Sequence, residues 1–248
     1  MTFFYSVHMK KTKQFLLLIS VSFFTAILLF TQNLLSIPVF LEKESPKAIY
    51  KGENGIALTF DIGWGDEKAG QILHTLIRHK AKATFFLSAS WAERHPDLVK
   101  KMKDHHFEIG LLGYNYVDYT SMEKAEIRKD LLKAQEVFKK LQIEEIKLVR
   151  APTGHFNQEV LKIVNEMNLT YVHWSIDTND WRNPGTASIL SKVKAAKNGD
   201  IIFMHASDSA KQTNAVLPQI IDISRSSDKL VTVSELIANG EVETKLIP

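Results

Sequence analysis

From residue 55 onward, short apolar runs alternate with longer segments of helical periodicity, and this alternation limits the chain to an α/β architecture. Most of the runs are continuously apolar, which is typical of parallel strands that are buried on both faces. The seven candidate strands are residues 56–62, 83–89, 107–112, 146–150, 171–176, 200–205 and 230–233.

The segments between these runs predict helices. The clearest one begins at Thr120, because Thr120 and Glu123 have the spacing of a capping box and an apolar stripe follows them. The other predicted helices are 67–79, 91–103, 157–167, 186–197 and 212–225. Repeated strand–helix units fit a (β/α) barrel of about seven parallel strands, one fewer than the usual eight, or an open doubly wound sheet.

The N-terminal segment carries a membrane signal. Residues 14–41 contain no charged side chain, residues 15–30 are almost wholly apolar, and Lys10, Lys11 and Lys13 precede them. This pattern predicts a transmembrane signal-anchor at 14–36 behind a basic cytoplasmic segment at 1–13, with the following chain on the outer face of the membrane. A cleaved signal peptide and secretion are the alternative, and Met9 could be the true start.

The remaining chain divides into a tether at 37–50, one large domain at 51–238 and a polar tail at 239–248. The 31 Lys and Arg exceed the 28 Asp and Glu by three, and the three lysines before the apolar segment account for the excess. The rest of the chain, residues 14–248, is therefore neutral, which argues against nucleic acid as a partner. The absence of cysteine excludes disulfides, thiolate metal sites and a thiol nucleophile.

Polar residues interrupt the apolar runs at their carboxyl ends, where the chemistry of both candidate folds is located. Asp61 ends the first run, Arg150 the fourth and His205 the sixth, while Asp180 follows the fifth. Such a set permits acid–base hydrolysis. We assign Asp61 as the base, Arg150 as its partner, His205 as the acid and Asp180 as the residue that orients His205.

Aromatic side chains beside these positions could stack on sugar rings, although aromatics after buried strands also cap a core. They are Trp64, Tyr114, Tyr116 and Trp181. The sequence contains no serine-hydrolase elbow, phosphate-binding loop, zinc-binding His-Glu helix or dinucleotide fingerprint.

At residues 50–237 the chain resembles the polysaccharide deacetylases (NodB homology domain, carbohydrate esterase family 4). The motifs that carry the resemblance are Thr59-Phe-Asp61, Arg150-Ala-Pro-Thr-Gly154, Asp177-Thr-Asn-Asp180-Trp181 and Ile202-Phe-Met-His205. The resemblance implies a distorted (β/α) barrel and removal of acetyl groups from glycans such as peptidoglycan. The start of the first motif and the stretch 205–213 are most similar to the sporulation-associated PdaB-type subgroup.

The sequence departs from the family at the metal site. In the family, an Asp and two His hold a divalent metal such as zinc, and the matching positions here are Ile62, Leu112 and Tyr116. None of these side chains can replace a carboxylate or an imidazole as a ligand. We therefore expect no cofactor, with Asp66 as a possible weak ligand.

Three interpretations follow. The first is a deacetylase-like hydrolase that acts on acetamido carbon–nitrogen bonds of cell-wall or spore peptidoglycan by an atypical mechanism. The second is a glycan-binding module without catalysis, and the third is an assembly factor of the cell or spore envelope. We favour the first, because a module that only binds glycan has no need of an acid–base pair such as Asp61 and His205. In each case the expected partners are a glycan and, through the N-terminal segment, the membrane.

Overall fold

The computed structural model describes residues 9–35, 46–238 and 243–245, with side chains described for 13–27 and 46–238. The chain forms two units, Met1–Ser45 and Pro46–Pro248. In the first unit, helix α1 (Met9–Leu35) has exposed side chains from residue 13 to residue 27. Among the described residues, no helix has both the length and the apolar character needed to cross a membrane. Residues 1–8 and most of the predicted tether lie outside the described residues.

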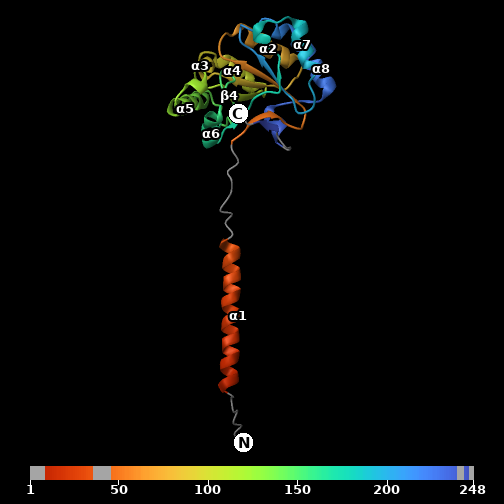
Figure 1. The fold of residues 1–248 in the computed structure, drawn as a ribbon. Coiled ribbons are helices and arrows are strands. Elements are labelled where there is room, and N and C mark those ends of the chain that lie inside the picture. The colour runs from red at the N-terminus through yellow and green to blue at the C-terminus, as the bar shows by residue number, and fades with distance from the viewer. Residues whose placement is uncertain (1–8, 36–45, 239–242, 246–248) are drawn as a thin grey trace. The chain divides into compact units, whose positions relative to one another are not determined.

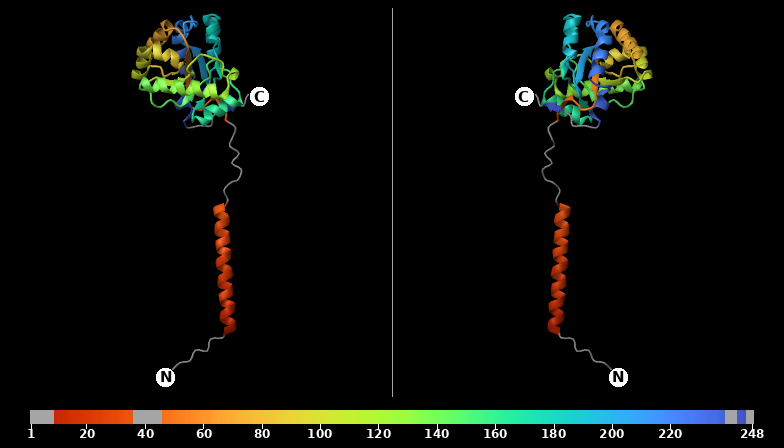
Figure 2. Two further views of the ribbon diagram at one scale, coloured as in Figure 1. Left: turned by 90° about the vertical axis from the view of Figure 1, so that its left-hand side faces the viewer. Right: turned by 90° about the vertical axis from the view of Figure 1, so that its right-hand side faces the viewer.

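The second unit is built on a parallel sheet with helices packed around it (Figures 1 and 2). Seven strands follow one another across the sheet, and an eighth pairs with the N-terminal end of β2. In order across the sheet they are β6 (Thr170–Tyr171), β5 (Leu148–Val149), β4 (Glu108–Leu111), β3 (Thr84–Leu87), β2 (Ile56–Ile62), β8 (Ile201–His205) and β7 (Ile176–Asp177), with β9 (Leu230–Val231) beside β2.

The sheet curls into an incomplete barrel, because its two outermost strands are nearly consecutive in the chain. Tyr171 ends β6 and Ile176 begins β7, so five residue steps, at most about 18 Å, join them. In a flat sheet of seven strands the same two strands would lie about 29 Å apart. The structure therefore agrees with the (β/α) barrel and excludes the open doubly wound sheet.

Strand β1 (Ala48–Lys51) lies at the gap between the ends of the sheet. Ile49 forms a parallel bridge with Val172 after β6, and Lys51 forms an antiparallel bridge with Asp200 before β8. The end of the predicted tether is thus part of the folded unit. Within the predicted polar tail, strand β10 (Glu243–Lys245) pairs antiparallel with β1, and the other residues of that tail lie outside the described residues.

Helices follow most strands of the sheet. They are α2 (Glu67–Arg78), α3 (Ala89–Arg94), α4 (Pro96–Asp104), α5 (Lys124–Lys140), α6 (Gln158–Glu166), α7 (Thr186–Val193), α8 (Thr213–Ser227) and α9 (Val233–Ile237). The single helix predicted at 91–103 is two helices, because Pro96 disfavours a helical conformation at His95. The capping box of α5 is formed by Glu123 and Glu126, three residues after the predicted start at Thr120.

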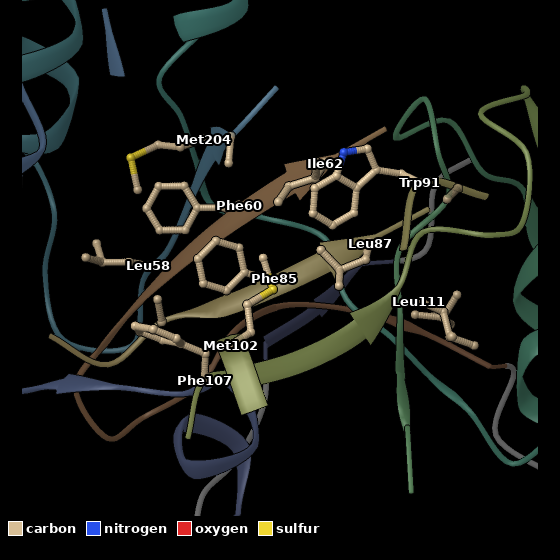
Figure 3. Packing of buried hydrophobic residues seen from close by; sticks show 14 of the residues in the cluster. Leu58, Phe60, Ile62, Phe85, Leu87, Trp91, Met102, Phe107, Leu111 and Met204 are labelled. Atoms are coloured by element: carbon tan, nitrogen blue, oxygen red, sulfur yellow. The ribbon is translucent and has the colours of Figure 1, made fainter. Parts of the chain in front are cut away.

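Alternate residues of the strands face two different cores. On β2, Leu58 and Phe60 point outward toward the helices, where Phe60 stacks on Phe85 of β3 and packs near Met204 of β8 (Figure 3). Ala57 belongs to the second cluster, on the inner face of the barrel. Alternate residues of a strand point to the same face, and Asp61 follows Ala57 by four positions. Asp61 therefore lies on the inner face, at the carboxyl end of β2.

Candidate active site

Asp61 and Arg150 form a buried ion pair on the inner face of the barrel. Arg150 Nη1 donates to Asp61 Oδ1 over 2.7 Å, and the two side chains are 0% and 3% exposed. Burial raises the pKa of Asp61, although the charge and hydrogen bond of Arg150 and the charge of His205 act against this effect. A carboxylate with a raised pKa is a better proton acceptor, which suits the predicted role as a base.

Arg150 is fixed by more than this ion pair. Its guanidinium donates to Thr59 Oγ1 at 3.2 Å and to the carbonyl oxygens of Val172 and His173 at 3.3 and 3.1 Å. The guanidinium carbon also lies over aromatic rings, at 4.1 Å from Phe86, 5.3 Å from Trp174 and 5.1 Å from Phe203. These contacts hold the guanidinium in one orientation beside Asp61.

His205 and Asp180 form a second buried pair. His205 Nδ1 is 2.8 Å from Asp180 Oδ1, and the His205 backbone N–H donates to Asp180 Oδ2 over 2.8 Å. Thr213 Oγ1 also donates to Asp180 Oδ2 over 2.6 Å. Burial lowers the pKa of His205, but the hydrogen bond and charge of Asp180, with the charges of Asp61 and Asp177, outweigh it, and the net pKa is raised. Because Asp180 occupies Nδ1, Nε2 is the nitrogen that can face a ligand.

The predicted aromatic residues differ in their surroundings. Trp64, Tyr116 and Trp181 are each about half exposed, which leaves ring surface available to a sugar. Tyr114 is half-buried, with its ring under the Lys133 ammonium at 3.5 Å and its hydroxyl 3.4 Å from Glu93. Tyr114 is therefore already engaged by α3 and α5 rather than free for a ligand.

The positions that the family resemblance matches to metal ligands hold residues that do not fit a metal ion. Ile62 is buried in the outer core near Trp91 (Figure 3). Leu112 is buried in the inner core. The ring of Tyr116 lies against the backbone of Gly63, and burial together with the charge of Asp61 raises the pKa of Tyr116 to about 12. This phenol is neutral at physiological pH and does not supply an anionic ligand.

Asp66, the predicted weak ligand, lies apart from the buried pairs. It precedes helix α2 with 63% of its side chain exposed, and it faces His95, whose Nδ1 is 3.8 Å from Asp66 Oδ2. Among the described residues, no three His, Asp or Glu side chains are grouped closely enough to hold a metal ion. The expectation that no cofactor is needed stays a prediction, which metal analysis must test.

Two polar residues that the sequence pattern did not single out support the segments around the site. Asp208 Oδ1 accepts from the Lys68 N–H over 2.9 Å and so caps α2, which precedes it by 140 residues. Asp130 is buried on α5 and accepts from the backbone N–H groups of Tyr114 and Asn115 at 2.7 and 3.1 Å. Its buried position within an otherwise apolar helix stripe is the one signal that could have identified it.

Comparisons with known proteins show which sequences this chain resembles. The family model for polysaccharide deacetylase matches residues 49–172. A peptidoglycan-N-acetylglucosamine deacetylase of Bacillus cereus is 36% identical over 75% of this chain and 89% of its own length. The Bacillus subtilis protein YlxY is 32% identical over 84% of this chain and 65% of its own length, slightly less than two thirds.

A solved structure is also similar. Wild-type BA3943 of Bacillus anthracis, described as a CE4 family pseudoenzyme, superposes with a TM-score of 0.73 at 29% sequence identity, covering 83% of this chain and 74% of its own. The sequence match and this structural similarity lead to the same conclusion: the chain belongs to the polysaccharide deacetylase family (NodB homology, carbohydrate esterase family 4).

Proposed function

We propose that this protein is a deacetylase-type hydrolase that acts on acetamido groups of peptidoglycan or a related N-acetylated glycan. The observation that carries the proposal is the register of β2 and β8, in which Asp61 lies directly opposite His205. Each of the two residues also has its own buried partner, Arg150 or Asp180. The substrate class is supported by the B. cereus relative, which is named for deacetylation of peptidoglycan N-acetylglucosamine.

The reaction uses water and two proton transfers. Asp61 accepts a proton from water while the water oxygen bonds to the acetyl carbonyl carbon. His205, protonated and oriented by Asp180, then donates its Nε2 proton to the amide nitrogen as the carbon–nitrogen bond breaks. The products are acetate and a free amine on the sugar. Ile62, Leu112 and Tyr116 do not fit a metal ion, so each proton transfer is assigned to a side chain of the protein.

A second candidate function is glycan binding without hydrolysis. Its support is the filling of the metal-ligand positions by apolar or neutral groups, together with the description of BA3943 as a pseudoenzyme. The burial of Asp61, which is 2% exposed, also limits the access of water to the proposed base. Both candidates place the glycan at the same end of the barrel, beside Trp64 and Trp181.

Acetate release and glycan binding, measured on one preparation, separate the two candidates. The purified full chain is incubated with N-acetylglucosamine oligosaccharides and with peptidoglycan, with a chelator and with added zinc. Hydrolysis predicts acetate release that Asp61→Asn and His205→Gln abolish, while the exposed control Asp222→Asn retains it. Binding without release under every condition favours the second candidate. Release that both site variants retain would refute our assignment of base and acid.

We also propose an envelope location and a role in sporulation. The support is the run of Lys10, Lys11 and Lys13 before an apolar segment, and the similarity of residues 205–213 to the PdaB-type subgroup. Both stay predictions from the sequence. Fractionation of cells during growth and spore formation, followed by detection of the protein in each fraction, tests them together.

A further inference from the structure

Tyr116 has a position at the mouth of the barrel that the proposed reaction does not yet use. It belongs to the loop between β4 and α5, and its side chain is 47% exposed. Among the described residues, none forms a hydrogen bond with its hydroxyl group. The hydroxyl is therefore available to a ligand, whereas the hydroxyl of Tyr119, three residues later, is bonded to buried Asp130 at 2.7 Å.

The ring of Tyr116 is placed by direct contact with Gly63, two residues after Asp61. A methyl group added at Gly63 would lie 2.6 Å from Tyr116 Cδ2 and 3.1 Å from Cε2, so the ring packs against a surface that only glycine leaves open. Gly63 is not among the glycines with positive φ, so its backbone conformation suits other residues as well. The restriction at this position is therefore the space that the Tyr116 ring occupies.

The loop that carries Tyr116 is also anchored from behind. Asp130, which is 6% exposed, accepts hydrogen bonds from the backbone N–H groups of Tyr114 and Asn115 and from the side-chain amide of Asn115. The backbone N–H of Ser90 donates to the Tyr114 carbonyl over 3.1 Å. The loop is thus fixed to α3 and α5, and the orientation of Tyr116 is built into the fold.

The electrostatic environment keeps the phenol protonated. Burial and the negative charge of Asp61 raise the pKa of Tyr116 to about 12, so at neutral pH the group is a hydrogen-bond donor. The charge of Asp61 acts on the Tyr116 phenol, so the phenol lies within electrostatic range of the proposed base. Such a donor can bond to a carbonyl oxygen, and the bond strengthens as negative charge develops on that oxygen during the addition of water.

We infer that the Tyr116 hydroxyl donates a hydrogen bond to the acetyl carbonyl oxygen of the bound glycan, at the position where the family resemblance places a metal-ligating imidazole. The inference rests on the proposed function, because it needs an N-acetylated glycan at this mouth. The inference applies to both candidate functions. In hydrolysis the hydrogen bond polarises the acetyl carbonyl, and in binding without hydrolysis it contributes to recognition of the acetyl group. Tyr116 acts on the ligand, and Gly63 and Asp130 are positioning residues.

The test compares substitutions that remove the hydroxyl or move the ring. Tyr116→Phe keeps the ring and is expected to weaken binding of N-acetylglucosamine oligosaccharides to the full chain about 2- to 10-fold, the value of one hydrogen bond. Gly63→Ala should produce a similar loss by displacing the ring. In a Tyr116→Ala background, Gly63→Ala should cause no further loss. Val117→Ala, a substitution of the partly exposed neighbour, is the matched control with wild-type binding.

The outcomes separate this inference from the proposed function. If the wild-type chain binds the oligosaccharide and Tyr116→Phe binds it equally well, Tyr116 has no such role and the proposed function stands. If the wild-type chain neither binds the oligosaccharide nor releases acetate, the proposed function fails and the inference fails with it. If acetate is released, Tyr116→Phe should lower kcat more than it raises KM, because the hydrogen bond strengthens as charge develops on the carbonyl oxygen.

Discussion

Asp61 and His205 occupy directly opposite positions on the parallel strands β2 and β8, and the backbone N–H of Ala206 donates to the Asp61 carbonyl over 3.0 Å. Because side chains at paired positions of adjacent strands point to the same face, the two ionisable groups share one side of the barrel. Their charges influence each other: the charge of Asp61 helps to raise the pKa of His205, and His205 acts to lower that of Asp61. The two buried pairs therefore form one electrostatic unit.

Arg150→Met should strongly destabilise the fold. The substitution leaves the buried Asp61 without its cation, and breaking a buried ion pair from one side costs about 3–5 kcal/mol. Urea unfolding measures the loss in free energy of unfolding. The control Arg128→Met removes an Arg whose ion pair with Glu166 is about 40% exposed, and it should cost less than about 1 kcal/mol. Equal effects of the two substitutions would contradict the buried arrangement.

The stability of the domain should depend on pH through His205. Its pKa in the folded state is raised above the ordinary value of about 6.5, so the contribution is fully present below about pH 6.5 and is lost as pH rises through the folded pKa. Unfolding by urea across this range should show the decline in the wild type and a flatter profile in His205→Gln. His74→Gln, which replaces an exposed histidine of α2, is the matched control. A wild-type profile in His205→Gln would refute the assignment.

Asp130→Asn should destabilise the loop between β4 and α5. The asparagine amide would place an N–H donor where Asp130 now accepts from the backbone N–H groups of Tyr114 and Asn115. A buried group left without a hydrogen bond lowers the free energy of unfolding by about 1–3 kcal/mol. Urea unfolding measures this cost, and oligosaccharide binding should weaken because Tyr116 loses its support. The exposed control Asp222→Asn should change stability by less than about 0.5 kcal/mol. If Asp130→Asn kept the wild-type free energy of unfolding and the wild-type binding of oligosaccharide, the backbone contacts to α3 would be sufficient to hold the loop.

The wild-type chain should hold no stoichiometric zinc after dialysis, because Ile62, Leu112 and Tyr116 offer no ligand set. Elemental analysis that finds about one zinc per chain would contradict this prediction. The combined variant Ile62→Asp, Leu112→His and Tyr116→His restores the three ligand types that the family resemblance implies. It should gain zinc binding, measured by calorimetry, and lose stability, because Ile62 and Leu112 are fully buried in apolar cores.

Much of the site could be predicted because it depends on strand order and strand polarity. Asp61, Arg150 and His205 end separate apolar runs, and the carboxyl ends of parallel strands meet at one edge of a barrel or sheet. The convergence of these residues therefore follows from the sequence pattern once the strands are parallel. The choice between barrel and open sheet could not be predicted, because it depends on which strands become the two ends of the sheet.

The sequence by itself determined the α/β alternation and the set of polar residues at the strand ends, since both depend on local periodicity. Only the tertiary structure decided which residues support them. The cap of α2 by Asp208, the anchoring of a loop by Asp130 and the contact of Tyr116 with Gly63 join segments that are far apart in the chain. No local propensity encodes such contacts. They arise only when packing brings distant segments of the chain together.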